Sequence, residues 1–436
     1  IGKIKEINPD VIAFSLVSTR YAWVKNLARE IKTKFNKPVI IGGPHATFFP
    51  EIINQNFVDI ICIGEGEGAI LELSDKLEKR KSINKIKNLW VKNKGKIYKN
   101  SVRPLIQDLD SIPFADRTLY KKYSFFRKEN KDDFTASRGC PYNCTFCFNK
   151  KYNEIYKDKG KISRRRGVEN LINEIKQTVK TNIKINHIQF HDDSFTLGPN
   201  EWFDKFLNMY KQEIDLPFSI NTRANLINEK IIKILKKAGC NSIRMGIESA
   251  NPYLREMILR KQISNEQIIK SVKIIKKYKI KLQVYNILGI PGETLDTAFQ
   301  TYELSYKIHP QHAWCSLMQP YPGTEIMEIA KQQNLIKGDY RFEDLDNSYF
   351  NTLPLKINNN KQFCNLQKLF QLGNVLRIPK NIMRFLIKLP PNKLYELIFK
   401  INFAIGIKQM DNLSWNYIFG VALHSKDFFK RKNKKT

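Results

Sequence analysis

The sequence predicts an α/β protein in three parts: a short α/β unit, a larger α/β unit and a mostly helical C-terminal region. Three observations lead to this prediction. Strand-length apolar runs alternate with helical patterns over residues 1–101, the alternation restarts at residue 133 and repeats six times, and it stops near residue 335. Such alternation is typical of parallel sheets covered on both faces. We therefore expect units at 1–101, 133–335 and 336–436, with a linker at 102–132.

The first unit reads as three parallel strands followed by a hairpin. Strands are expected at residues 10–15, 38–41 and 59–63, helices at 22–35 and 69–77, and a hairpin at 89–101. Two strands end in glycine-rich turns, Gly42-Gly43-Pro44-His45 and Gly64-Glu65-Gly66-Glu67-Gly68. The chain starts with Ile1 inside this pattern, so we expect part of the unit to precede it.

The second unit repeats the strand–helix alternation six times. Strands are expected near 134–137, 187–190, 217–221, 242–247, 282–288 and 313–318, with helices such as 169–179, 229–237 and 265–278 between them. Ser264 and Gln267 form a capping box at the start of the last helix. Six βα units predict an open or partial (βα)6 barrel, in which chemistry is expected on the loops after the strands.

The C-terminal region has helical apolar spacing at 366–376 and 393–405, interrupted by prolines, and ends in a basic tail at 426–435. Residues 378–407 carry more apolar side chains than a lone exposed helix tolerates, but Lys and Pro interrupt them too often for a membrane span. Three interpretations stay open. The segment packs on the barrel, lies at a membrane surface whose anionic headgroups meet the tail, or lines a pocket for an apolar, lipid-like substrate.

Composition excludes several classes of protein. A hydrophobic fraction of 42% excludes wholesale disorder, and 74 Lys+Arg against 42 Asp+Glu give a net charge of +32. That charge suits nucleic acid, a membrane surface or an anionic substrate, or else it forms a solvated Lys-rich surface. Seven cysteines form no even disulfide framework, which favours the reducing cytoplasm. The sequence contains neither an apolar run of about 18 residues nor a signal peptide pattern.

The strongest chemical signal is a cluster of three cysteines, Cys140, Cys144 and Cys147, just after the first barrel strand. A four-iron cluster usually takes four thiolates, so three leave one iron free to bind a small molecule. A structural zinc site is the alternative, but it needs a fourth ligand. Four further cysteines stand alone in the sequence, and we expect them to pack as small apolar residues: Cys62, Cys240, Cys315 and Cys364.

The spacing C-x3-C-x-aromatic-C, with Phe146 as the aromatic residue, resembles the signature of radical S-adenosylmethionine enzymes over residues 134–335. The resemblance implies a [4Fe-4S] cluster whose open iron binds S-adenosylmethionine. It also implies an external electron donor of the flavodoxin or ferredoxin type. The electron cleaves the sulfonium to give a 5′-deoxyadenosyl radical, which abstracts hydrogen from an unactivated carbon. No catalytic residue beyond the cluster is assigned.

The same resemblance implies a binding site for S-adenosylmethionine at the later strand ends. Carboxylates would accept from its ammonium, a guanidinium would pair with its carboxylate, and an apolar segment would pack on adenine. Glu248 and Ser249 would hold the ribose hydroxyls or the methionine moiety. The residues so implied are Phe146, Asp192, Asp193, Arg223, Glu248, Ser249 and Gly289.

The first unit resembles the Rossmann-like domain of cobalamin-binding enzymes, through Ser15-Leu16-Val17, the Gly42-Gly43 pair and the third-strand turn. Small residues at strand ends let the backbone approach the corrin. The implied cobalamin contacts are Ser15, Thr19, Gly42, Gly43, His45, Gly64 and Glu65. The motif D-x-H-x-x-G, whose histidine ligates cobalt, would lie upstream of Ile1, and His45 is not assigned to cobalt. A degenerate unit that binds nothing is the alternative.

Together these features predict a cytoplasmic cobalamin-dependent radical S-adenosylmethionine enzyme that methylates a carbon of a small-molecule or lipid-like substrate. Peripheral membrane contact is one of the interpretations that stay open. Radical rearrangement or cyclisation is an alternative outcome. A tRNA methylthiotransferase is another, but it needs three cysteines in the first unit, and Cys62 is the only one before Cys140. We therefore do not expect a nucleic-acid partner. A non-catalytic cobalamin- or metal-binding protein is the third alternative.

Overall fold

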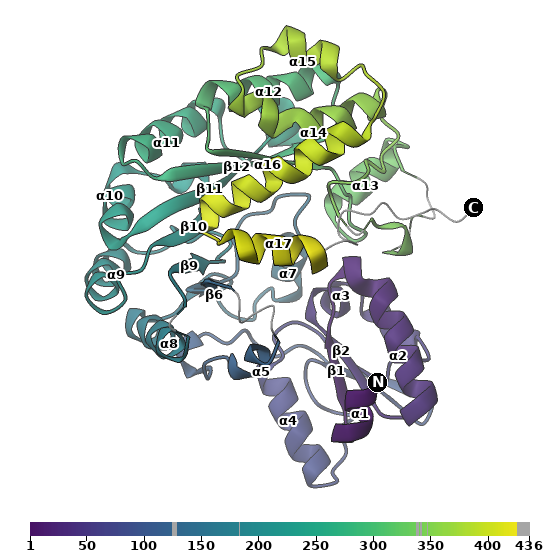
Figure 1. Ribbon diagram of the computed structural model, residues 1–436. Helices are drawn as coiled ribbons and strands as arrows, with labels where there is room; N and C mark the ends of the chain where they lie inside the picture. Colours follow the sequence, from purple (N-terminus) through teal and green to yellow (C-terminus); the bar gives the residue numbers. More distant parts are fainter. Residues whose placement is uncertain (124–128, 183, 337–339, 341, 347, 425–436) are drawn as a thin grey trace.

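The computed structural model describes residues 1–436 except 124–128, 183, 337–339, 341, 347 and 425–436. Two α/β units lie next to each other, and the C-terminal helices pack along the larger one (Figure 1). The basic tail at 426–435 lies outside the described residues.

The first unit is built on a five-stranded sheet in the order β1-β2-β3-β4-β5. Strands β1 (Ile12–Ser15), β2 (Val39–Gly42) and β3 (Ile60–Cys62) are parallel, whereas β4 (Leu89–Asn93) and β5 (Lys96–Lys99) form an antiparallel hairpin. Its helices are α1 (Gly2–Ile7), α2 (Tyr21–Phe35), α3 (Gly43–Phe48) and α4 (Glu67–Glu78). The predicted strands and hairpin are therefore present. The predicted turn at Gly43 is instead the first turn of α3.

The second unit is a six-stranded parallel sheet in the order β13-β12-β11-β10-β9-β6, so neighbours in the chain are neighbours in the sheet. Strands β6 and β13 form its two edges, so the barrel is open, as predicted. The strands are β6 (Lys131–Phe134), β9 (His187–Phe190), β10 (Phe218–Thr222), β11 (Cys240–Glu248), β12 (Lys281–Leu288) and β13 (His312–Leu317).

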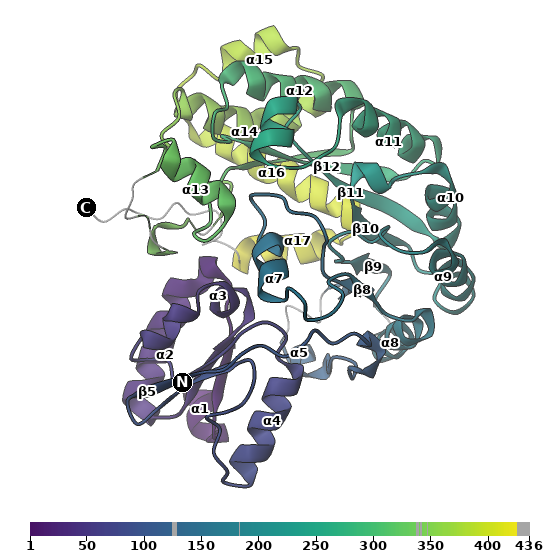
Figure 2. The same ribbon diagram turned by 180° about the vertical axis from the view of Figure 1, so that it is seen from behind.

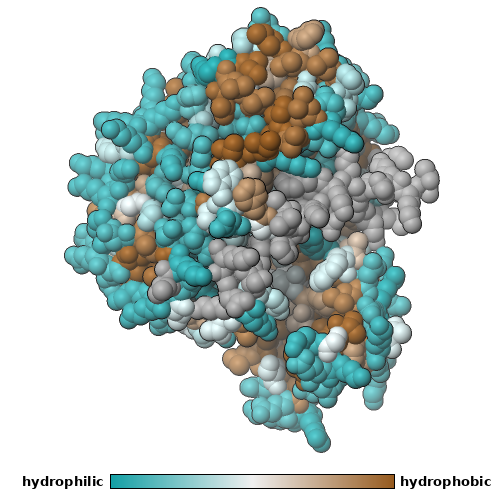
Figure 3. All heavy atoms as spheres, in the orientation of Figure 1, coloured by the Kyte–Doolittle hydropathy of each residue, from teal (hydrophilic) through white to brown (hydrophobic). Residues whose placement is uncertain are grey.

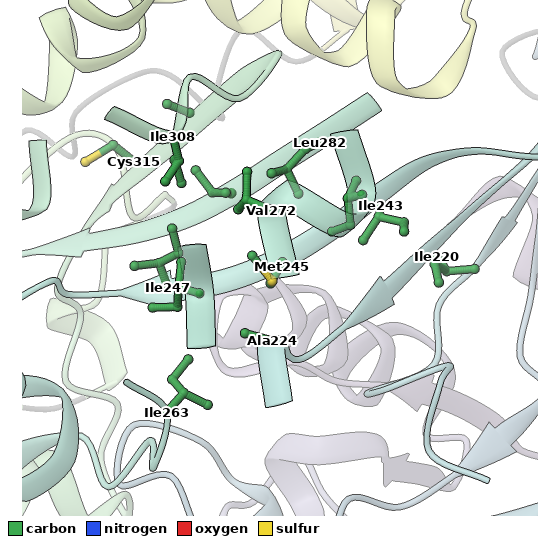
Figure 4. Close-up of a cluster of buried hydrophobic side chains, with 14 of the residues drawn as sticks. Ile220, Ala224, Ile243, Met245, Ile247, Ile263, Val272, Leu282, Ile308 and Cys315 are labelled. Carbon is green, nitrogen blue, oxygen red and sulfur yellow. The ribbon is translucent and has the colours of Figure 1, made fainter. Parts of the chain in front are cut away.

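Helices cover the outer face of this sheet (Figures 1 and 2). They are α8 (Val168–Thr181), α9 (Asn200–Glu213), α10 (Glu229–Ala238), α11 (Asn265–Lys277), α12 (Leu295–Ile308) and α13 (Glu325–Gln332). The core lies between helices and sheet, where alternate residues of β11, Ile243, Met245 and Ile247, pack with side chains such as Val272 (Figure 4). The intervening residues of β11 point to the opposite, concave face.

The first barrel strand lies three residues earlier than the sequence predicts, at Lys131–Phe134 instead of 134–137. The reason is Asp192, whose carboxylate accepts the Ala136 N–H at 3.1 Å and draws the chain out of the sheet. Ser137–Arg138 then forms a separate strand, β7, antiparallel to β8 (Arg164–Arg165). Two further helices are α5 (Thr118–Lys121), in the linker, and α7 (Asn149–Ile155), after the cysteines.

Four C-terminal helices follow: α14 (Asn360–Val375), α15 (Lys380–Leu386), α16 (Lys393–Asp411) and α17 (Trp415–His424). Helix α16 crosses the concave face of the barrel sheet (Figure 1). The Ser242 hydroxyl donates to the Met410 carbonyl at 2.8 Å, and Arg244 forms a buried ion pair with Asp411. One side of α16 thus packs on the barrel. No helix of the described residues has the length and apolar character of a membrane span.

Candidate functional site

The carboxyl ends of the two parallel sheets face a common cavity of about 1000 Å³. Parallel α/β sheets place their ligand sites at this end of the strands. The first unit contributes Val17, Ser18, Thr19, Gly43, Pro44, Thr47, Phe48, Gly64, Glu65, Gly66 and Glu67 to the lining. The second contributes Thr135, Ser137, Arg138, Gly139, Phe146, Cys147, Phe148, Asn149, Tyr152, Arg164, His191, Asp193 and Tyr321.

The cysteine loop enters this cavity directly after β7. Cys140 and Cys144 are buried and Cys147 lines the cavity. Thr145 anchors the loop, because its hydroxyl donates to the Ile258 carbonyl at 2.7 Å and its N–H donates to the Leu259 carbonyl at 3.1 Å. The three thiols are therefore held by hydrogen bonds to a distant part of the barrel.

The three thiols form one electrostatic group. Burial, together with the nearby Cys144 and Cys140 thiols and Asp193, raises the pKa of Cys147 to about 11, against the effect of the Asn149 N–H. Burial likewise raises the pKa of Cys140. None of the cysteines in the described chain is in a disulfide. A bound metal must supply the positive charge that keeps such thiols ionised.

This donor set fits an iron–sulfur cluster better than a zinc ion. All ligands of a zinc site lie about 2–2.3 Å from one ion, and no three His, Cys, Asp or Glu side chains of the described residues are arranged to hold a single metal ion in that way. In a four-iron cluster each iron takes its own thiolate, so the ligands lie farther apart. Cys140, Cys144 and Cys147 are three neighbouring thiols, of which Cys147 lines the large cavity, and they meet that need.

Arg223, which follows β10, lies against the cysteine loop. Its guanidinium Nη1 is 3.6 Å from Cys144 Sγ, and its Cζ lies 3.7 Å from the centre of the Tyr142 ring. Asn225 bonds both partners, donating to Tyr142 Oη at 3.2 Å and accepting from Arg223 Nε at 3.3 Å. The resemblance assigned Arg223 to the cofactor's carboxylate. That role stays a prediction, and the guanidinium lies beside Cys144 Sγ.

The two aspartates after β9 differ in their surroundings. Asp192 is buried and accepts hydrogen bonds from the Ala136 N–H and the Ser137 hydroxyl, so it holds the chain just before the cysteines. Asp193 lines the cavity, and the Asn149 amide donates to it at 3.4 Å. Burial raises the pKa of Asp193, against the effect of the Asn149 hydrogen bond. Asp193 is thus the carboxylate that a ligand in the cavity can reach.

Of the other implied residues for S-adenosylmethionine, Phe146 lines the cavity, whereas Glu248, Ser249 and Gly289 are bonded inside the barrel and are not in the lining. Glu248 forms a buried ion pair with Lys261 at 2.7 Å. Ser249 is fully buried, and its hydroxyl lies 3.5 Å from that of Thr301 on α12. The Gly289 N–H donates to the Glu293 carboxylate at 2.5 Å, and burial raises the pKa of Glu293 to about 8.

Two positions on the first-unit side of the cavity, Gly43 and Gly64, require glycine because other parts of the chain pack closely against them. Gly43 has φ +85°, and a Cβ there would lie 2.8 Å from the Leu16 nitrogen. Gly64 has φ +75°, and a Cβ there would overlap the Tyr156 hydroxyl. Thr47 joins the two turns by donating to the Gly43 carbonyl at 3.0 Å and accepting from the Gly64 N–H at 2.9 Å. Larger residues would disrupt these turns before any ligand arrived.

Of the implied cobalamin contacts, Thr19, Gly43, Gly64 and Glu65 line the cavity. Ser15 and Gly42 lie behind this lining at the ends of β1 and β2, where Ser15 Oγ approaches Gly43. His45 is 1% exposed and bonded to the Ser18 hydroxyl at 3.0 Å. Its ring packs among the aromatic rings of Tyr21, Phe49 and Phe342.

Glu65 also joins the two units. Its Oε1 bonds Arg164 at 2.8 Å and Arg138 at 3.2 Å, and its Oε2 accepts the Ile106 N–H at 2.9 Å. Sequence reasoning did not single out Arg138 and Arg164. Two features of the sequence could have indicated them. Arg138 stands next to the cysteine motif, in Ser-Arg-Gly-Cys, and Arg164 begins a run of three arginines.

Comparison with known proteins matches both units to described families. The radical SAM superfamily matches residues 134–305, and the B12 binding domain matches residues 1–74. An uncharacterized methyltransferase of Pyrococcus horikoshii is 33% identical over 76% of this chain and 72% of its own length. The anaerobic magnesium-protoporphyrin IX monomethyl ester cyclase of Rubrivivax gelatinosus is 24% identical over 75% of this chain and 59% of its own length. The hopanoid C-3 methylase of Methylococcus capsulatus is 23% identical over 80% of this chain and 66% of its own.

Solved structures have the same fold. The cobalamin-dependent S-adenosylmethionine radical enzyme OxsB superposes with a TM-score of 0.67 at 16% identity, over 98% of this chain and 68% of its own. The radical S-adenosylmethionine methyltransferase TsrM of Kitasatospora setae superposes with a TM-score of 0.62 at 16% identity, over 76% of this chain and 67% of its own. With the three thiols and the cavity between the sheets, these matches show that the chain belongs to the cobalamin-dependent radical S-adenosylmethionine methyltransferase family, whose cofactors are a [4Fe-4S] cluster, S-adenosylmethionine and cobalamin.

Proposed function

We propose that this chain methylates an unactivated carbon of a small-molecule or lipid-like substrate. The observation that supports the proposal is the single cavity, where Thr19, Gly43 and Gly64 of the first unit lie opposite Cys147 and Asp193 of the second. When bound, the cluster supplies the electron that cleaves S-adenosylmethionine, and cobalamin carries the methyl group. The protein's own contribution is to hold these groups around one water-excluding space.

On the barrel side, Cys140, Cys144 and Cys147 are the proposed cluster ligands. The Arg223 guanidinium, 3.6 Å from Cys144 Sγ, stabilises the negative charge of the ligating sulfurs. Asp193 accepts from the ammonium of S-adenosylmethionine, and Asp192 acts through its hydrogen bonds to the adjoining backbone.

Within the barrel, Phe146 and Gly289 remain proposed contacts for the same cofactor. Glu248 and Ser249 are proposed to support its site through Lys261 and Thr301.

On the first-unit side, the proposed cobalamin contacts are Thr19, Gly43, Gly64 and Glu65, with Ser15 and Gly42 supporting the turn from behind. His45 is proposed to hold Ser18 in place and not to contact cobalt, because its ring is buried among aromatic side chains. We further propose that the domains follow the expected division, at 1–101, 133–335 and 336–436.

The relatives support the substrate class in outline. They include a hopanoid methylase, a magnesium-protoporphyrin ester cyclase and TsrM, whose structure contains tryptophan as substrate. We propose a substrate of comparable kind, an electron donor of flavodoxin or ferredoxin type, a cytoplasmic location and peripheral contact with a membrane. Oxidative cyclisation is the second candidate reaction, because the cyclase of Rubrivivax gelatinosus is among the relatives.

The decisive experiment is anaerobic reconstitution with iron, sulfide and cobalamin, followed by reductant, S-adenosylmethionine and extract metabolites. Methylation predicts 5′-deoxyadenosine, S-adenosylhomocysteine and a product heavier by one methyl group, all by mass spectrometry. Cys147→Ala is the inactive control, and Cys240→Ala, a buried thiol outside the cavity lining, is the matched active one. A product lighter by hydrogen atoms, without S-adenosylhomocysteine, would contradict methylation and favour cyclisation.

A further inference from the structure

The outer surface of α15, α16 and the loop between them carries large apolar side chains in contact with solvent. Figure 3 shows this surface as a brown area over the C-terminal helices. We call it the apolar face, and its members are between 37% and 66% exposed: Ile382, Phe385, Leu389, Leu394, Leu397, Ile401 and Ile405.

The apolar face is a feature of helix geometry, because the exposed residues of α16 recur on successive turns. Leu394, Leu397 and Ile401 are spaced three and four residues apart, which places them on one side of the helix. Tyr395, Phe399 and Met410 are buried on the other side. A helix that is apolar on both sides needs two apolar environments. The barrel is the apolar environment for one side of α16, and the apolar face requires another.

Basic side chains share this exposed surface. Lys388, Lys393 and Lys400 are exposed on the same helices and the loop between them. Residues 380–411 contain six basic residues, Lys380, Arg384, Lys388, Lys393, Lys400 and Lys408, but two acidic ones, Glu396 and Asp411. Asp411 is buried in its ion pair with Arg244. Lys380 and Arg384 form ion pairs with Glu303 and Asp296 of α12. The positive charge beside the apolar face is therefore contributed mainly by Lys388 and Lys393.

We propose that the apolar face docks on an anionic lipid surface. Leucine, isoleucine and phenylalanine side chains would enter the boundary between headgroups and acyl chains, while the lysines extend to the phosphate groups. A second copy of this chain fits the surface poorly. Two such faces would bring the same lysines together, on a protein with a net charge of +32. An anionic membrane satisfies the apolar and the charged groups at once.

Vesicle co-sedimentation of the full chain tests this proposal without any cofactor or turnover, so its failure is distinguishable from failure of the proposed function. The vesicles are phosphatidylcholine alone, and phosphatidylcholine with phosphatidylserine. We expect binding to the anionic vesicles at low salt, weaker binding at high salt, and little binding to phosphatidylcholine.

Two pairs of variants locate the binding surface. Leu397→Gln with Ile401→Gln should weaken binding to anionic vesicles about tenfold or more, because both side chains lose their apolar contact. The matched control is Ile70→Gln with Leu71→Gln on α4 of the first unit, where both residues are similarly exposed.

Lys388→Glu with Lys393→Glu should weaken binding at low salt by at least about fivefold per residue. Lys230→Glu with Lys233→Glu on α10 is its control.

None of the changed side chains is buried, so we expect every variant to fold. Thermal unfolding measurements check this. All variants keep the tail at 426–435, so binding by that tail alone would leave every variant unchanged and overturn the proposal. Equal binding to neutral and anionic vesicles would also overturn it. So would a stable dimer that Leu397→Gln with Ile401→Gln dissociates, because a second copy would then cover the apolar face.

Discussion

The two sheets present different groups to the same cavity. The first unit offers mostly glycine backbone and short side chains, with Gly43 and Gly64 held by Thr47, and adds Phe48, Glu65 and Glu67. The barrel offers thiols and charges, with Cys147 and Asp193 in the lining and Arg223 behind them. The first arrangement suits a large ligand recognised by shape, and the second suits ligation and polar contact. Substitutions on the two sides should therefore fail in different ways.

The largest expected effect is on the barrel side. Cys140→Ala, Cys144→Ala or Cys147→Ala should each abolish cluster binding and 5′-deoxyadenosine formation, because three thiolates are the minimum that holds a cluster with one open iron. Cys240→Ala and Cys315→Ala, which remove thiols buried in the barrel core, should retain both. Iron content and product analysis provide the measurement, and full turnover by any of the three variants would refute the assignment.

On the first-unit side, Gly64→Val should act on structure before it acts on binding. The new side chain meets the Tyr156 hydroxyl at a backbone φ of +75°, which should cost about 1–3 kcal/mol or more of unfolding free energy. Cobalamin binding should be lost while iron content is kept. Denaturant unfolding and spectroscopic titration with cobalamin test this. Gly95→Val is a control with φ +76° and open space around it, and an equal loss of cobalamin binding there would contradict the steric explanation.

Substitution of the two aspartates of the barrel should affect different quantities: cofactor affinity at Asp193 and barrel stability at Asp192. Asp193→Asn should weaken S-adenosylmethionine binding about tenfold or more with little change in stability, since losing the charged partner of a buried polar contact costs about 2–5 kcal/mol. Asp192→Asn should mainly lower the stability of the barrel, because it alters the hydrogen bonds to Ala136 and Ser137. Equilibrium binding and thermal unfolding distinguish the two. Unchanged affinity in both variants would identify ordinary structural charges.

A pH dependence of stability should arise in the barrel, at Glu293. Burial raises its pKa from 4.5 to about 8, so the folded state binds its proton more tightly than the unfolded state does. The stabilisation from this group is fully present below pH 4.5 and is lost as the pH rises towards 8. Glu293→Gln should flatten the decline of unfolding free energy between those values. Denaturant titrations at several pH values test this, with exposed Glu303→Gln on α12 as the control. Equal slopes in Glu293→Gln and the native chain would be the contrary result.

The smallest effect is expected at Thr47. Thr47→Val removes the hydroxyl that joins the Gly43 and Gly64 turns, at a cost of about 1 kcal/mol, whereas Thr47→Ser keeps it. Cobalamin affinity should fall by no more than about tenfold in Thr47→Val and stay near the native value in Thr47→Ser. If the two variants behave alike, the methyl group and not the hydroxyl matters at this position.

Local sequence patterns predicted the strands and the cysteine loop because each depends on nearby residues. The positions of strands β9 to β13 follow from apolar runs, and the spacing of Cys140, Cys144 and Cys147 is itself local. The early end of β6 was not predictable, because it depends on Asp192, far along the chain. For the same reason the sequence could not show that Asp193 and not Asp192 lines the cavity.

Long-range contacts also explain the remaining differences. His45 follows a glycine turn that resembles a ligand contact, yet its side chain is buried by Tyr21 and by Phe342, which is distant in sequence. Arg223 lies beside Cys144 and Tyr142 because β10 ends next to the cysteine loop in space. No periodicity or motif within one segment contains that information.

Helix α16 covers the concave face of the barrel sheet, and this has a consequence for the synthesis of the protein. Ser242 and Arg244 leave the ribosome long before their partners Met410 and Asp411. During synthesis the concave face of the sheet is therefore open to water, and the Arg244 guanidinium has no acidic partner from α16. Helix α16 emerges after every barrel strand, so the concave face is covered late in synthesis. A premature stop just before residue 411 removes Asp411 and everything after it, and it should therefore leave the Arg244 guanidinium in the barrel without its acidic partner.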